Sequence, residues 1–215
     1  MSQDLYTTAL LVFTSFFTLI NPLGSMPIFM SMTSTLSKKR RKQTAKKASL
    51  VAFFTIIGFA FSGQIMFDFF GISADSFRIV GGFIFFAMGW DMLQARLVNI
   101  KHTDDEDKID AYVEDVSITP LAIPMICGPG AITNAIVLME DSQTLPQKIV
   151  LIAVIAVVLL LTYLILVGGS KITDFLGETG NKVMMRLMGL IVMVIAVEFF
   201  FSGLKPIVSS MIGNQ

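Results

Sequence analysis

Two short segments place proline and glycine beside polar side chains within otherwise apolar stretches. They lie at residues 21–27 and at residues 124–133, where the second contains the run Gly128-Pro129-Gly130. Because each proline removes an amide donor and clashes with the preceding helical turn, both segments predict a break in a helix. A helix that begins after a break presents free amide hydrogens, which suit an anionic group. The free carbonyls of the preceding helix suit a cation, so such breaks fit a small zwitterion.

Candidate binding residues follow from these breaks. Glycine allows the backbone to approach a ligand closely and builds a narrow site, which favours a small solute. We expect the broken ends to meet near the membrane midplane in one pocket, lined by Asn21, Gly24, Ser25, Gly128, Gly130 and Thr133. The full set of expected substrate-binding residues adds Pro22, Pro27, Pro129 and Ala131. The alternative is that proline and glycine only kink ordinary membrane helices.

The elements that must position these segments are long and apolar. Hydrophobic residues make up 54% of the 215 residues and charged residues 15%, which is more apolar surface than a soluble core absorbs. The apolar residues form long runs, so we predict an all-α polytopic membrane protein with six transmembrane helices, the first and fourth of them broken. The predicted spans are 5–32, 48–67, 77–93, 116–139, 149–167 and 187–204.

The two halves of the chain repeat one pattern in the same order. Prolines five residues apart occur in the first and fourth spans, and the motif at 78–81 in the third span matches that at 186–189 in the sixth. Each half has three spans, so the second half is inverted, as in many secondary transporters. We therefore predict a single membrane domain, 1–215, with a three-helix repeat at 1–95, an acidic cytoplasmic linker at 96–115 and an inverted repeat at 116–215.

Basic residues are unevenly shared between the two sides of the predicted bundle. By alternation of the spans, 13 of the 16 Lys and Arg residues lie on one side, including a cluster of seven at 38–47. Since cytoplasmic loops carry an excess of Lys and Arg, we predict these loops in the cytoplasm and both termini outside the cytoplasmic (inner) membrane. The cluster is interpreted as a topology determinant on anionic headgroups, with a specific-lipid or nucleic-acid patch as the alternative.

Four charged residues inside the spans need partners or an aqueous surface. The inverted arrangement puts Arg78 and Glu198 at one depth, and Asp91 and Arg186 at the other. We predict that each pair forms an ion pair between the halves and acts as a gate. The alternative is that each side chain reaches the headgroups alone or caps its own helix.

An intramembrane enzyme is disfavoured by the side chains of the spans. The chain has one histidine, His102 in the linker, and one cysteine, Cys127, and it has neither a nucleophile motif nor metal-ligand spacing. We therefore expect no catalytic residue, metal or cofactor. A channel stays open as an alternative to a carrier, because broken helices also line pores.

Taken together, the motifs at 21–27, 76–82, 120–132 and 186–199 resemble those of the MarC family of bacterial and archaeal membrane proteins. The resemblance covers nearly the whole chain. Family members include SnatA-type transporters of small neutral amino acids, and the family is grouped with LysE-like exporters. The resemblance implies a secondary transporter of glycine, alanine or serine in contact with membrane lipid and without nucleic acid. Coupling to H+ or Na+, a homo-oligomeric state, and an exporter or channel for another solute are left open.

Overall fold

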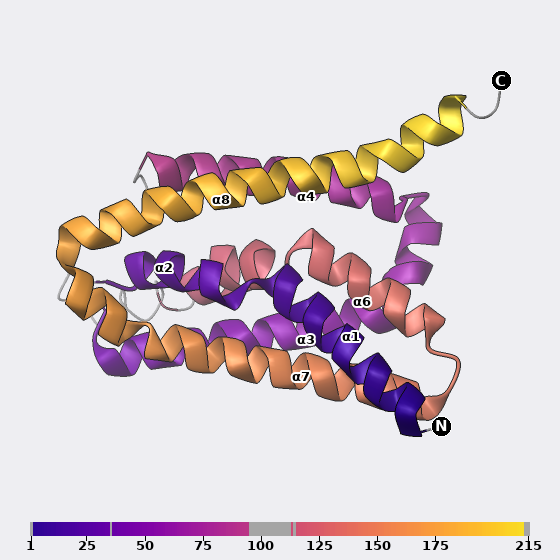
Figure 1. The fold of residues 1–215 in the computed structure, drawn as a ribbon, viewed down its shortest axis with the longest axis horizontal. Helices are drawn as coiled ribbons and strands as arrows, with labels where there is room; N and C mark the ends of the chain where they lie inside the picture. The colour runs from indigo at the N-terminus through magenta and orange to yellow at the C-terminus, as the bar shows by residue number, and fades with distance from the viewer. Residues whose placement is uncertain (1, 35, 95–112, 114, 213–215) are drawn as a thin grey trace.

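The computed structural model describes residues 2–34, 36–94, 113 and 115–212, and all the regular elements in this part of the chain are helices (Figure 1). The predicted linker at 96–115 lies outside the described residues except at positions 113 and 115. The elements are α1 (Ser2–Ile20), α2 (Pro22–Met32), α3 (Lys38–Phe70), α4 (Ala74–Leu93), η1 (Ser117–Ile126), α6 (Pro129–Asp141), α7 (Leu145–Gly168) and α8 (Ser170–Ile212).

Five stretches of the described chain are long and apolar enough to cross a membrane. They are Leu5–Met30, Lys38–Phe70, Ala74–Leu93, Leu145–Gly168 and Lys182–Ile212. A sixth crossing results if η1 and α6, which meet at a bend of 60°, count as one span. These positions agree with the six predicted spans, so the prediction of an all-helical, multi-pass membrane protein is confirmed.

Short polar caps define where the central helices begin and end. The Ser37 hydroxyl accepts a hydrogen bond from the amide of Arg40 at the start of α3, and Ser73 does the same for Ser76 at the start of α4. Gly71 ends α3 with φ 64°, a left-handed conformation that glycine adopts without a steric penalty. The chain therefore reverses within three residues between α3 and α4.

The helices are arranged with α4 and α8 along one edge of the molecule and α3 and α7 along the opposite edge (Figure 1). Large side chains of α1, α2, α3, η1 and α7 form the core, among them Phe16, Phe29, Ile56, Ile126 and Ile155. In contrast, α4 and α8 pack mainly on each other. Other large apolar side chains are exposed on the helix surfaces, as helices solvated by lipid require.

Glycines bring α4 and α8 into direct backbone contact. A Cβ atom added to Gly89 would lie 2.8 Å from the carbonyl oxygen of Gly189, and one added to Gly189 would lie 2.8 Å from that of Gly89. Further along the contact, toward the start of α4 and the end of α8, Gly82 faces the carbonyl of Ala196 and Gly203 faces that of Asp75. The two helices are therefore antiparallel and as close as small residues allow, which is a common way for membrane helices to associate.

The ends of the helices alternate between the two ends of the bundle. Helix α1 begins and α8 ends at the same end of the molecule, whereas α3 begins and α4 ends at the other (Figure 1). The cluster of basic residues at 38–47 thus lies at the end opposite to the start of α1. Which end faces the cytoplasm stays a prediction from the charge distribution.

Candidate functional site

Asn21 separates α1 from α2. Its φ is 46°, in the left-handed region that asparagine enters more readily than most residues. The side-chain oxygen of Asn21 accepts a hydrogen bond of 3.1 Å from the Gly24 amide, and the Ser25 hydroxyl donates to the Asn21 carbonyl at 3.0 Å. Asn21 therefore caps α2, and its own side chain satisfies a backbone group that the interruption leaves free.

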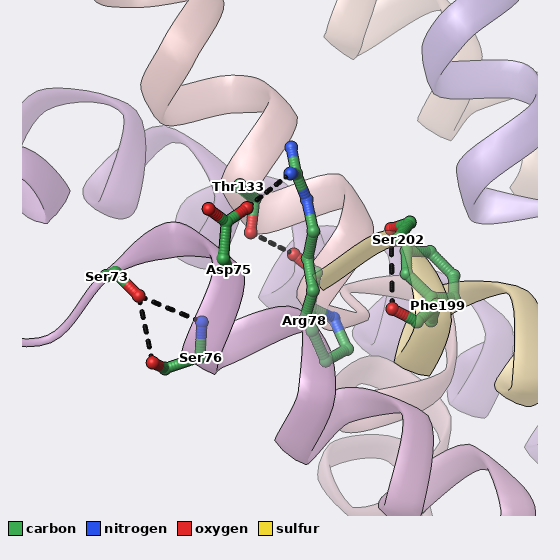
Figure 2. Close-up of polar contacts among 8 residues, drawn as sticks. Ser73, Asp75, Ser76, Arg78, Thr133, Phe199 and Ser202 are labelled. Carbon is green, nitrogen blue, oxygen red and sulfur yellow. Dashed lines mark hydrogen bonds and ion pairs between the residues drawn. The ribbon is translucent and has the colours of Figure 1, made fainter. Parts of the chain in front are cut away.

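The second interruption lies between η1 and α6. Thr119 and Ile123 have non-helical backbone angles, and each precedes a proline, which disfavours the helical conformation. Gly128 is extended and Pro129 opens α6. The Thr133 hydroxyl donates to the Pro129 carbonyl at 2.7 Å (Figure 2), so it is engaged within its own helix.

A cavity of about 170 Å³ lies beside the first interruption. Asn21, Gly24 and Ser25 line it, together with Met125 of η1 and residues of α4 and α8. Since a water molecule occupies about 30 Å³ in the liquid, a cavity of this size holds a solute of only a few heavy atoms. All of the side chains that line the cavity in the described part of the chain are uncharged.

The wall that faces the second interruption consists of two aromatic rings. Phe85 of α4 and Phe199 of α8 line the cavity, and their ring centroids are 5.7 Å apart. A Cβ atom added to Gly128 would lie 2.6 Å from Cζ of Phe85, and one added to Gly130 would overlap Cζ of Phe199. The glycines of the second interruption therefore lie against the rings that form the wall.

The structure brings half of the expected pocket residues to the cavity. Asn21, Gly24 and Ser25 line it, but Gly128 and Gly130 are separated from it by the two phenylalanine rings. The expectation that these glycines line the pocket directly thus differs from the structure, because the large rings of α4 and α8 fill the space beside them. Thr133 is buried and bonded within α6, and Pro22, Pro27, Pro129 and Ala131 are buried. Substrate binding by any of these residues stays a prediction.

Two residues of the cavity wall and one buried amide of α6 are not predicted by the sequence analysis. Phe85 and Phe199 stand among 19 phenylalanines, and no pattern distinguishes them from packing residues. Asn134 lies one turn beyond Gly130, and its side-chain nitrogen is buried without a hydrogen-bond partner. A signal for Asn134 was present, since an amide inside a membrane span is unfavourable unless it has a partner.

Arg78 forms its ion pair within α4 rather than across the two halves. Its Nη1 lies 2.9 Å from Oδ1 of Asp75, and the two side chains point toward each other (Figure 2). Arg78 forms no ion pair with its predicted partner, Glu198, and Cβ of Arg78 instead faces Gly203, five residues beyond Glu198 on α8. This ion pair within one helix is neither the predicted bridge nor the alternative of a side chain that reaches the headgroups alone or caps its own helix. A pair this exposed contributes at most about 1 kcal/mol.

The other predicted bridge involves Asp91 and Arg186. Both side chains are exposed, as is that of Glu198. Within the residues that the structure describes, the four charged side chains expected to pair across the halves form no such ion pair. A role for them as gates stays a hypothesis without support from this conformation.

The comparisons with known proteins agree with this architecture. The family described as MarC family integral membrane protein matches residues 6–208. A UPF0056 membrane protein of Pyrococcus horikoshii is 41% identical over 198 residues, which cover 92% of this chain and 94% of the relative. The UPF0056 membrane protein YvbG of Bacillus subtilis is 34% identical over 203 residues, covering 93% and 96%. No solved structure matches significantly. Because the match extends over nearly all of the sequence, the chain belongs to the MarC family of integral membrane proteins.

Proposed function

We propose that this protein is a secondary transporter of small neutral amino acids, such as glycine, alanine and serine, across the cytoplasmic membrane. The observation that carries the proposal is the small uncharged cavity beside an interrupted membrane helix. Polar backbone at the depth of the hydrocarbon is tolerated only where it is buried in protein or lines a polar cavity. The proposal requires no catalytic residue, metal or cofactor.

Two helix ends supply the charge recognition in this proposal. The last turn of α1 contributes Thr18, Leu19 and Ile20 to the cavity wall, and the first turn of α2 contributes Gly24 and Ser25. The C-terminal end of a helix carries a partial negative charge and the N-terminal end a partial positive charge. An ammonium group is thus favoured at α1 and a carboxylate at α2, so the backbone matches both charges of an amino acid.

The rest of the wall restricts the side chain of the substrate. Phe85, Met88 and Val192 line the cavity beside the helix ends. They offer a substrate side chain no charged partner and little space. A charged side chain would be buried there without a counterion, and a large one would not fit. Small neutral amino acids are therefore the class that this cavity favours.

The predicted inverted repeat fits the same function. In this proposal the first half contributes the interruption at Asn21 and the second half contributes the bend between η1 and α6. Both lie next to the same pair of rings, because Phe85 contacts Gly128 and Phe199 contacts Gly130. Transporters with inverted repeats bind their substrate where such discontinuous helices meet. H+ and Na+ are the coupling ions to test first.

The proposal predicts saturable exchange in proteoliposomes. Vesicles loaded with unlabelled alanine should take up labelled glycine, alanine and serine by counterflow. A carrier exchanges the internal alanine for the labelled amino acid outside. Leucine, lysine and glutamate should compete poorly, since the cavity is small and uncharged. Protein-free vesicles are the control for leakage.

Two results would contradict the proposal. The absence of exchange for every small amino acid, in protein that elutes as a folded species, would show that small neutral amino acids are not the substrates. Flux that rises linearly with concentration and shows no counterflow would instead identify a channel.

A further inference from the structure

A second cavity, of about 590 Å³, opens between α3 and α7, on the edge of the molecule opposite to α4 and α8 (Figure 1). It is separate from the proposed transport cavity, and the two share no lining residue. Helix α3 contributes Lys42, Lys46, Ser49, Leu50 and Phe53. Helix α7 contributes Ala156, Leu159, Leu160 and Tyr163. We call this hollow the α3–α7 groove.

The α3–α7 groove is basic at one end and apolar along the rest of its length. Lys42 and Lys46 lie one turn apart on α3, and Phe53 lies about 16 Å beyond Lys42 at the helical rise of 1.5 Å per residue. Because α7 ends where α3 begins, Tyr163 belongs to the basic end and Ala156 to the apolar end (Figure 1). A ligand that fills the groove must therefore have an anionic or strongly polar head and an apolar tail.

The position of the two lysines matches the headgroup region of a bilayer. They directly precede the apolar run that begins at Ala48, so the groove extends from the interface into the hydrocarbon. Further positive charge surrounds them, because a neighbouring hollow that shares Lys46 is lined by Arg40 and Lys47. Anionic headgroups are attracted to such a basic cluster next to a membrane span.

Ser49 adds a polar group to the wall of the groove. Ser49 is 7% exposed, and its hydroxyl oxygen is buried without a hydrogen-bond partner. Nearby hydroxyls behave differently, since Thr44 donates to the carbonyl of Arg40 at 3.0 Å and Thr162 donates to that of Val158 at 2.8 Å. A buried hydroxyl is normally satisfied by such a bond or by a ligand, so Ser49 is a candidate donor to a group in the groove.

We propose that the α3–α7 groove binds one anionic phospholipid, whose phosphate contacts Lys42 and Lys46 and whose acyl chain lies against Leu50, Phe53 and the apolar residues of α7. The observation that carries this proposal is that two lysines lie at one end of an apolar groove that runs along α3 and α7. An acidic soluble partner would not fill the apolar part, and a neutral lipid would leave the lysines without a counterion. The bilayer supplies the ligand.

The first experiment tests the role of the lysine charges and compares two double variants. Purified protein in mixed detergent micelles is titrated with phosphatidylglycerol or phosphatidylcholine, and bound lipid is counted by native mass spectrometry. Lys42→Gln with Lys46→Gln should weaken binding of phosphatidylglycerol by about 10-fold to 30-fold, given the contribution of two lysines at an anionic surface. The matched control is Lys38→Gln with Lys39→Gln, which removes the same charge outside the groove. An equal loss in both variants would show diffuse attraction only and would overturn the site.

A second experiment tests whether the acyl chain of the lipid occupies the apolar part of the groove. Ala156→Trp should block the apolar part and abolish tight binding of phosphatidylglycerol while every lysine remains. Val157→Trp is the control, because Val157 is exposed on the same helix and does not line the groove. Normal binding to Ala156→Trp would overturn the proposal. So would equal displacement by glycerophosphoglycerol, the headgroup without chains, since it would assign the lysines to free phosphate esters.

Discussion

Gly130→Ala is expected to reduce amino-acid counterflow to the level of protein-free vesicles. An added Cβ would overlap Cζ of Phe199 and would lie 3.1 Å from Cδ2 of Leu19. The ring is the free end of a side chain, so it can move, and the space beside it is the cavity of about 170 Å³. The ring would then occupy the volume that the substrate needs. Membrane insertion and elution as a folded species should be unchanged, because the displaced atoms belong to a side chain and not to the backbone.

A second substitution tests this explanation directly. Phe199→Ala in the Gly130→Ala background should restore exchange, because the displaced ring is gone. Phe199→Ala alone should admit larger neutral amino acids such as leucine. Gly168→Ala is the control, since no atom lies within 4 Å of a Cβ added there. Full activity of Gly130→Ala with an unchanged substrate range would show that the substrate does not pass through this cavity.

Gly189→Ala is expected to cause a large loss of stability. An added Cβ would lie 2.8 Å from the carbonyl oxygen of Gly89 and 2.9 Å from the amide nitrogen of Leu93. Both are backbone atoms, so the methyl group fits only if α4 and α8 move apart along their contact. Overpacking of this kind costs about 1–3 kcal/mol, which lowers the unfolding midpoint of a chain of this size by about 2–12 °C. Gly189→Leu should prevent accumulation of the folded protein.

Thermal unfolding in detergent, followed by tryptophan fluorescence or by loss of the monodisperse peak, measures this effect. Gly58→Ala is the matched control, because Gly58 also lies within a long helix but faces open space. That control should be neutral or slightly stabilising, since alanine lowers the entropy of the unfolded chain. An unfolding midpoint for Gly189→Ala equal to that of the control would contradict the close contact of the two helices.

The membrane spans could be predicted from the sequence because the hydrocarbon core dictates their length and composition. Residues 149–167 contain no charge, and α7 occupies the same stretch from Leu145 to Gly168. Local chemistry explains where α2 and α6 begin, since Asn21 tolerates a positive φ and Pro129 opens a helix. That the first and fourth membrane spans are broken stays a prediction. The inverted relation of the halves and the orientation in the membrane stay predictions.

The contacts between helices could not be predicted, because they depend on register. The matching motifs at 78–81 and 186–189 suggest that Gly81 and Gly189 are equivalent. In the structure Gly189 packs on the backbone of Gly89, whereas Gly81 packs against the ring of Pro129. This register moves Arg78 away from Glu198 and leaves Asp75 as its partner. It also brings Phe85 and Phe199 together, which nothing in their sequence positions indicated.

The backbone contact between α4 and α8 has a mechanical consequence for the cavity. Each helix contributes one ring to the wall, Phe85 from α4 and Phe199 from α8. At Gly89 and Gly189 the two backbones touch with no side chain between them. The two helices therefore have little freedom to slide or tilt independently. We expect the two helices to move as one body against α2 and α6. A displacement of the pair would therefore shift both rings at once, so the wall of the cavity would open or close as a unit.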